Sequence, residues 1–297
     1  MSEASTHASH RVPAWALALV AMLSVQLGAA LSTTLFPVVG PAGTAWLRLT
    51  AGAAIFIALN RPQIRGLRGR DLRLALALGV VTGVLTVAFL SSIERIPLGT
   101  AVAIEFLGPL GVAVVRSHDR RSLAWPVLAL VGVLLLTEPW RGDIDQVGVA
   151  LAALSGLCWA AYIVLTQQVG DRFGGLEGLS ITIPVAAVTA GVVGVPQAWG
   201  HITWEVVAAS VGLALLLPVI PFSLELMALR RLTAAAFGTL MALEPALGLV
   251  VGLVLLAQVP VGLQVLGVVL VVIAGVGAER SGHRHGHDGP DVPTQLG

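Results

Sequence analysis

Ten apolar segments occupy most of this 297-residue sequence, and all but the short fifth one are as long as a membrane-spanning helix. A helix needs roughly 17–25 mostly apolar residues to cross the hydrocarbon core of a bilayer. Charged residues make up only 11% of the chain and mean hydropathy is +0.90, whereas soluble domains carry about 25% charged residues. We therefore expect an all-α membrane protein with ten transmembrane helices. The predicted spans are 13–35, 43–59, 74–93, 97–115, 123–137, 147–167, 176–198, 206–228, 233–257 and 259–278.

The basic residues are distributed unevenly over the connections between these segments. All 17 of them are arginines. If both termini are cytoplasmic, every arginine lies in a cytoplasmic segment except Arg95 and Arg141, which fall in outer connections, and Arg48, which lies inside a helix. This asymmetry agrees with the positive-inside rule. Together with the absence of lysine and the richness in alanine, glycine and valine, it predicts a multi-pass protein of a bacterial cytoplasmic membrane.

The two halves of the chain are weakly similar to each other. Five spans per half is an odd number, so the halves would insert in opposite orientations. A shift of 136 residues also superimposes three pairs of identical residues, with apolar or small residues matching between them. These features predict an inverted repeat with the substrate site near the bilayer midplane, between the halves. The identical pairs are Arg95 and Arg231, Leu107 and Leu243, and Pro109 and Pro245.

The predicted organisation of the chain follows from these halves. The C-terminal tail is polar and rich in proline and glycine, which is typical of disorder. The units are a cytoplasmic N-terminal tail (1–12), a first five-helix repeat (13–137), a linker (138–146), a second five-helix repeat (147–278) and a disordered cytoplasmic C-terminal tail (279–297).

Two glutamates, Glu105 and Glu244, lie within apolar segments, each shortly before a proline. A charge near the bilayer centre costs on the order of several kcal/mol unless it faces a partner or a wet cavity. Pro109 has no N–H, so the carbonyl of Glu105 loses its helical partner, and Pro245 likewise frees the carbonyl of Met241. Such exposed backbone is tolerated only beside protein or a wet cavity. We expect the glutamates to bind the substrate or the coupling proton, although each could instead be hydrogen-bonded across a helix interface, with the proline giving only a kink.

The two glutamates are not strict symmetry mates. At the 136-residue shift the prolines coincide, whereas Glu105 falls on Met241 and Glu244 falls on Gly108. The carboxylates are therefore offset by about one helical turn. This offset predicts an asymmetric site in which the two glutamates have different tasks.

Five further residues are candidates for the site. Arg48 could bind a substrate carboxylate bidentately, neutralise a glutamate, or snorkel to the outer interface. Gln26 could donate to a carboxylate or simply join two helices. Glu225 lies near the cytoplasmic end of its helix, where a solvated role is more typical than substrate contact and a gate is an alternative. Trp159 and Tyr162 could wall a cavity or fill the bundle.

Several classes of function have no support in the sequence. Cys158 is the only cysteine, which excludes a disulfide framework and a thiolate metal site. The alternating His283, His285 and His287 could bind zinc or nickel weakly, but a solvated tail is the more ordinary interpretation. There is no His-Glu-x-x-His, Walker A or Gly-x-Ser-x-Gly motif, and a net charge of +1 does not suggest nucleic acid. We expect no enzymatic activity, no cofactor, no metal and no nucleic-acid partner.

Three stretches of this chain resemble a known family, the EamA branch of the drug/metabolite transporter superfamily, and within it the RhtA-type threonine/homoserine exporters. The resemblance implies a ten-helix fold and export of small amino acids or related metabolites, driven by the proton gradient. It also marks four of the polar residues above as candidate cavity residues: Gln26, Glu105, Glu225 and Glu244. The stretches are 24–29 with 35–37, 97–109, and 221–225 continuing to 237–245.

The chain departs from the family pattern at one position. EamA proteins commonly carry a glutamate at the end of the ninth helix, where this sequence has Gln258. Because a glutamine side chain does not titrate, Gln258 is not expected to carry a proton.

Our interpretation of the sequence is a secondary transporter that exports a small zwitterion such as threonine or homoserine by proton antiport. Glu105 and Glu244 would bind the substrate ammonium or the proton, and Arg48 would face the substrate carboxylate. An exporter of drugs or other metabolites is the nearest alternative, although its wider pocket should be richer in aromatic residues than the 5% found here. An intramembrane enzyme or a membrane scaffold explains less of the pattern. The exact substrate, the coupling ion, the direction of transport and the existence of a homodimer stay open.

Overall fold

A computed structural model describes residues 13–59, 69–116, 124–138, 145–170, 177–221, 224, 227 and 240–281. Every regular element within these ranges is helical, so the predicted all-α class is confirmed. The elements are α1 (Ala14–Ser32), η1 (Thr33–Leu35), α2 (Phe36–Leu59), α3 (Gly69–Ile93), α4 (Leu98–Glu105), α5 (Leu107–Arg116), α6 (Ala124–Thr137), α7 (Gln146–Gly170), α8 (Glu177–Ala198), α9 (Trp204–Ala214), η4 (Leu215–Val219), α12 (Glu244–Leu256) and α13 (Gly262–Ser281).

Four helical stretches of the described chain are long and apolar enough to cross a membrane by length and composition. Shorter apolar helices accompany them, among them the two that follow each other in Leu98–Ala113. The chain is therefore a membrane protein, and the number of ten crossings stays a prediction. The four long stretches are Ala14–Leu59, Gly69–Ile93, Gln146–Thr166 and Gly178–Ala198.

The longest of these stretches, Ala14–Leu59, bends at Gly40. The backbone there has φ 68° and ψ 169°, a conformation that is essentially restricted to glycine. The N–H groups of Ala42 and Gly43, just after the bend, donate to Gln197 Oε1 of α8 at 2.8 and 3.0 Å. The first N–H groups of a helix have no partner within the helix, so Gln197 satisfies two donors that the bend exposes.

The segment predicted as one helix at 97–115 is two helices in the structure. α4 ends at Glu105, α5 begins at Leu107, and Phe106 connects them. Pro109 lies in the first turn of α5, where a missing N–H costs least. A break also precedes Pro245, because α12 begins only at Glu244 after a turn at Ala242 and Leu243. Each buried glutamate therefore lies at a helix end rather than in a helix interior.

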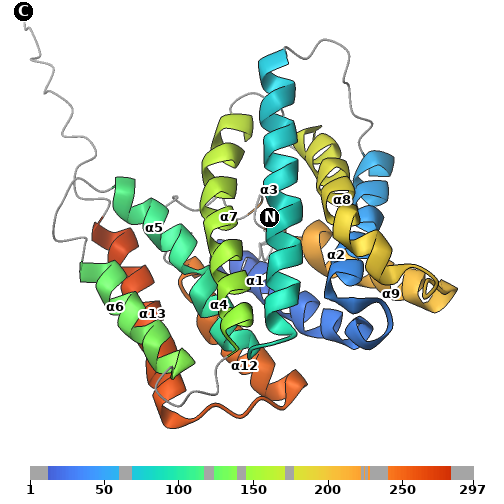
Figure 1. Cartoon of the computed structure of the whole chain (residues 1–297). Coiled ribbons are helices and arrows are strands. Elements are labelled where there is room, and N and C mark those ends of the chain that lie inside the picture. Colours follow the sequence, from blue (N-terminus) through green and yellow to red (C-terminus); the bar gives the residue numbers. More distant parts are fainter. Residues whose placement is uncertain are drawn as a thin grey trace, which may run out of the picture.

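Pairs of helices from distant parts of the sequence pack side by side. The most extensive pairings are α2 with α8, α3 with α7 and α8, α6 with α13, and α4 with α12. Figure 1 shows α6 and α13 together at one side of the molecule, α2, α8 and α9 at the other, and α3, α4 and α7 between them. The largest apolar cluster is formed mainly by α3 and α4, with contributions from α6, α12 and α13. Val102 of α4 and Phe106, just after it, are among its buried residues.

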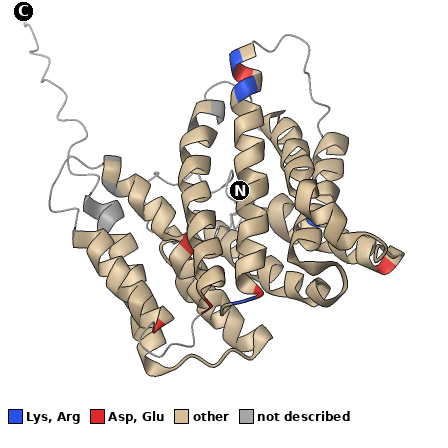
Figure 2. Cartoon of the chain, viewed as in Figure 1, with Lys and Arg blue, Asp and Glu red and all other residues tan. Residues whose placement is uncertain are grey.

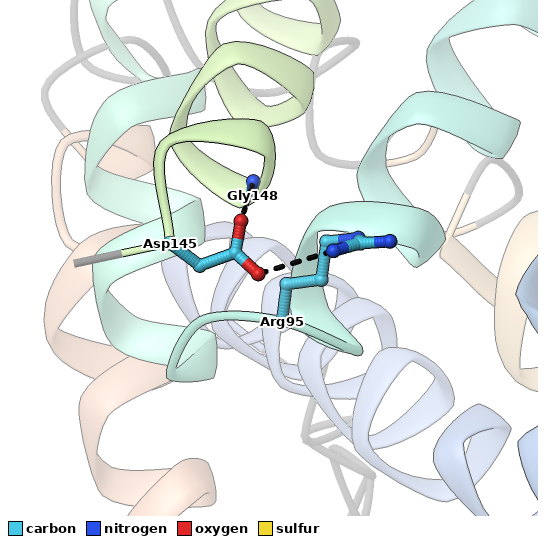
Figure 3. Close-up of polar contacts among 3 residues, drawn as sticks. All are labelled: Arg95, Asp145 and Gly148. Atoms are coloured by element: carbon cyan, nitrogen blue, oxygen red, sulfur yellow. Dashed lines mark hydrogen bonds and ion pairs between the residues drawn. The ribbon is translucent and has the colours of Figure 1, made fainter. Parts of the chain in front are cut away.

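Charged residues are few in the described chain and most lie near helix ends (Figure 2). Arg95, in the turn before α4, forms an ion pair of 3.1 Å with Asp145 just before α7 (Figure 3). Asp145 also caps α7, because its Oδ1 accepts from the N–H of Gly148 at 2.9 Å. This backbone bond, followed by the contact with Arg95, lowers the pKa of the Asp145 carboxyl below its ordinary value.

Candidate functional site

Glu105, the last residue of α4, is held by a side chain from another helix. Glu105 is 7% exposed, and its Oε1 accepts a hydrogen bond from the hydroxyl of Ser155 on α7. A buried carboxylate requires such partners, because removing an unpaired charge from water is costly. The contact joins residues 50 positions apart in the sequence.

Two glycines let α7 approach Glu105 this closely. A Cβ atom on Gly156 would lie 2.9 Å from the carbonyl oxygen of Glu105 and 3.3 Å from its Cα. A Cβ atom on Gly108 would collide with the carbonyl of Gly156. Small residues at a helix interface permit such backbone contact in membrane proteins. The break between α4 and α5 is thus packed directly against the backbone of α7.

Gln26 of α1 lies close to Val102 of α4 and Gly248 of α12. Val102 is about one helical turn before Glu105. A Cβ on Gly248 would be 3.4 Å from Gln26 Oε1 and 3.0 Å from a methyl group of Val102. Gln26 is buried, and its Oε1 has no hydrogen-bond partner among the described residues. A buried amide oxygen in this position can accept a hydrogen bond from a ligand ammonium or hydroxyl group.

Glu244, the first residue of α12, is 4% exposed. It lies at the level of Phe106, because Ala242 and Phe106 both line the same stretch of α13 around Gly275. The N-terminal end of a helix dipole stabilises negative charge. Glu244 lies at the N-terminal end of α12, whereas Glu105 lies at the C-terminal end of α4. The two carboxylates occupy the same region in different electrostatic settings.

Arg48 of α2 is held by a serine at the end of α1. Its Nη1 donates to Ser32 Oγ at 3.2 Å, and Ser32 Oγ donates to the carbonyl of Gly28 at 2.6 Å. Arg48 is only 3% exposed, so it does not snorkel to the surface. Its Nε has no hydrogen-bond partner among the described residues. The guanidinium therefore retains a donor for an anionic ligand.

The remaining predicted site residues are spread over different parts of the structure. Trp159 is half-buried and packs against the same apolar cluster as Phe106, so it lies on the Glu105 side of α7. Tyr162 packs in a separate cluster against Ala75 and Ile181. Glu225 lies outside the described residues. No group of three metal-ligating side chains occurs among the described residues.

Comparison with known proteins identifies the family. The chain is 37% identical to the threonine/homoserine exporter RhtA of Salmonella typhimurium strain SL1344 over 283 residues, which are 91% of this chain and 93% of that protein. It is 38% identical to the RhtA of Escherichia coli strain K12 over 281 residues, with 90% and 92% covered. Residues 146–277 match the EamA-like transporter family. The chain belongs to the EamA-like transporter family. It is a membrane transporter rather than an enzyme.

A solved structure shares the fold of this EamA-like chain. A crystal structure of another protein superposes with a TM-score of 0.58 and covers 89% of this chain and 97% of its own. The two sequences are only 19% identical, so the likeness extends to the fold alone. It shows that this helix arrangement exists in a protein of very different sequence.

The sequence interpretation of this EamA-like transporter missed three polar contacts. Ser155 holds Glu105, Ser32 holds Arg48, and Gln197 caps the bend at Gly40. Ser32 had one signal, since it follows Gly28 at the four-residue spacing of close helix contacts. The sequence signal for Ser155 was weaker: it is a small polar residue directly before Gly156. Nothing in the sequence distinguishes Gln197 from an ordinary polar residue at a helix end.

Proposed function

We propose that this protein exports threonine, homoserine or a similar small amino acid across a bacterial cytoplasmic membrane, by exchange for protons. The observation that carries the proposal is 37–38% identity, over 90% or more of the chain, to proteins that are threonine/homoserine exporters. The structure adds two buried carboxylates at helix breaks and a buried guanidinium, which are groups of the right charge for a zwitterion.

Glu105 and Glu244 are the proposed sites for the substrate ammonium and the proton. A carboxylate cannot bind an ammonium group and a proton on the same oxygen at once, so the two ligands compete. Competition at one site is sufficient for antiport, because loading with one ligand requires release of the other. Arg48, which retains an unused donor, is the proposed partner of the substrate carboxylate. Gln26 would accept from the substrate ammonium or hydroxyl group beside Val102 and Gly248.

The proposed architecture is ten crossings arranged as two inverted five-helix repeats, with both termini cytoplasmic. In such a repeat the second, fourth and fifth spans correspond to the seventh, ninth and tenth. These counterparts are neighbours in the structure, as α2 and α8, α4 and α12, and α6 and α13. Elements that meet their own counterparts lie along a two-fold axis, so these pairings support the repeat.

Three further helix contacts also have counterparts, as expected for a two-fold axis. The contact of α3 with α7 has its counterpart in the contacts of α1 with α9 and η4. The contact of α3 with α8 corresponds to the contact of α2 with α9. The contact of α4 with α7 corresponds to the contact of α1 with α12. In the proposed architecture, α1 and α4 of the first repeat contact α12 of the second. Transporters with inverted repeats bind substrate between the repeats, so we propose that the substrate binds beside Glu105, Gln26 and Glu244.

The test is efflux from proteoliposomes that contain purified protein and radiolabelled threonine or homoserine. We expect a proton gradient to drive efflux by the wild type, and we expect Glu105→Gln and Glu244→Gln to reduce it at least tenfold. Glu94→Gln is the matched control, since Glu94 is exposed in the turn after α3 and should not matter. Wild-type protein that moves neither amino acid would refute the proposed substrate. Full activity of both glutamine variants would refute the proposed site.

A further inference from the structure

Ser155 lies where three helices meet. Its side chain is fully buried, and α7, which carries it, packs against both α3 and α4. The Oγ atom is within hydrogen-bond reach of two acceptors, Oε1 of Glu105 on α4 and the carbonyl oxygen of Leu85 on α3, the latter at 3.3 Å. One hydroxyl thus connects the candidate site to two neighbouring helices.

A serine hydroxyl has one proton and two lone pairs, so Ser155 cannot donate to both acceptors at once. When Glu105 is ionised, both of its oxygens only accept, and Ser155 donates to the carboxylate. When Glu105 is protonated on Oε2, its neutral Oε1 still accepts from Ser155, although more weakly, and Leu85 O is the alternative acceptor for the serine proton. The hydroxyl therefore has a complete bonding arrangement for either state of the carboxyl group. An alanine provides neither arrangement.

We propose that Ser155 is a positioning residue that holds Glu105 in the same place in both of its protonation states. The bond to Oε1 leaves Oε2 for the substrate ammonium or for the proton that replaces it. Ser155 itself touches neither the substrate nor the proton in this scheme. The inference rests on the proposed function, because it assigns Glu105 a part in proton exchange.

Few other titratable groups lie near Glu105, so a change in the pH dependence of transport can be assigned to Glu105. Among the described residues they are Cys158 on α7, which is close enough to interact with the charge of Glu105, and Glu244 at the start of α12. Charged residues on α3, α5 and α13 lie at the ends of those helices, and α6 has none in Ala124–Thr137. A change in pH dependence after substitution of Ser155 would therefore report on Glu105.

The first experiment measures threonine efflux between pH 5 and 9 for the wild type and for Ser155→Ala. Hydrogen bonds to charged groups are about twice as strong as neutral ones, so loss of the hydroxyl removes more stabilisation from the ionised state. We expect the midpoint of the pH profile to rise by about one pH unit, which corresponds to about a tenfold change in proton affinity. Ser155→Thr keeps the hydroxyl and should keep the wild-type midpoint.

Ser210→Ala is the matched control. Ser210 on α9 is also buried, but its Oγ donates at 2.7 Å to Val206 O within its own helix. This variant should leave the midpoint unchanged. If Ser155→Ala lowers the rate equally at every pH, or if Ser210→Ala moves the midpoint as much, Ser155 has only a structural role and the proposal is wrong.

The second experiment does not depend on transport. The unfolding temperature of purified protein is measured over the same pH range for wild type, Ser155→Ala, Glu105→Gln and the double variant. Ser155→Ala should change the pH dependence of unfolding in the wild-type background and leave it unchanged in the Glu105→Gln background. The same change in both backgrounds would overturn the link between Ser155 and Glu105. If the link holds while neither threonine nor homoserine is transported, the proposed substrate fails and the positioning role stands.

Discussion

Gln258 Oε1 accepts a hydrogen bond of 2.9 Å from the backbone N–H of Leu98, so a side chain beyond the end of α12 caps the start of α4. The placement of Gln258 follows from the turn before it. Ala257 has a left-handed conformation with φ 52°, and the N–H of Gln258 returns to the carbonyl of Gly252 at 3.1 Å, which is a common way to end a helix. Gln258 therefore has a structural task in this chain.

Gln258→Leu should lower the stability of the protein. It leaves the N–H of buried Leu98 without its acceptor, which costs about 1–3 kcal/mol. Gln258→Glu keeps an acceptor and should retain the wild-type unfolding temperature in detergent. Gln264→Leu is the control, since Gln264 accepts from Val261 N at an exposed site where water can replace it. Equal unfolding temperatures for Gln258→Leu and the wild type would show that the cap is unimportant.

Gly40→Ala should destabilise the bend within α2. The backbone conformation at Gly40 costs a residue with a Cβ about 1–3 kcal/mol, and the added carbon would also collide with the Gln197 side chain. Gly212→Ala is the control, because Gly212 lies in α9 with a normal helical backbone and no atom within 4 Å of a Cβ. That variant should be neutral or slightly stabilising. Thermal unfolding separates the two, and equal stability of both variants would contradict the role of the bend.

Asp145→Ala should destabilise the protein at neutral pH and have no effect at low pH. The pKa of Asp145 is lowered in the folded state, chiefly by the N–H of Gly148. A group of this kind stabilises the fold above its unfolded pKa, about 3.9 for aspartate, and the stabilisation disappears as the pH falls through the folded pKa. The difference in unfolding temperature between wild type and variant should be full above about pH 5 and disappear once the pH is well below the lowered pKa of Asp145.

Arg95 is the internal control for that experiment. The Arg95–Asp145 pair is exposed, with 42% and 34% of the two side chains accessible, and exposed ion pairs contribute little. Arg95→Ala should therefore have a smaller effect than Asp145→Ala, and added salt should reduce it further. A larger loss for Arg95→Ala would show that the ion pair, rather than the helix cap, is the stabilising contact.

The apolar helical segments and the two candidate glutamates could be found from the sequence, because those features are local. Hydropathy marks a helix within about 20 residues, and a proline determines which carbonyl loses its partner four residues earlier. Glu105 could therefore be singled out before its surroundings were known. The break at Phe106 lies within the turn that Pro109 disturbs.

The partners of these residues could not be predicted, because the contacts join distant segments. Ser155 and Ser210 are both serines in apolar helices, yet one bonds a carboxylate 50 residues away and the other bonds its own helix. Gln197 and Gln258 reach across 155 and 160 residues to their backbone donors. Such choices depend on which helices meet, and single-sequence patterns do not contain that information.

Gly156→Ala should impair transport more strongly than the small size of the added methyl group suggests. The added Cβ would be 2.9 Å from the carbonyl oxygen of Glu105, and backbone atoms on both sides leave no flexible group to give way. Overpacking of this kind costs about 1–3 kcal/mol, and relief by moving α7 outward would also break the Ser155–Glu105 bond. Gly111→Ala, on α5 with no atom within 4 Å of its Cβ, should transport like the wild type. Efflux and unfolding temperature are measured for both variants, and a Gly156→Ala protein with normal efflux would show that close contact between α4 and α7 is not required.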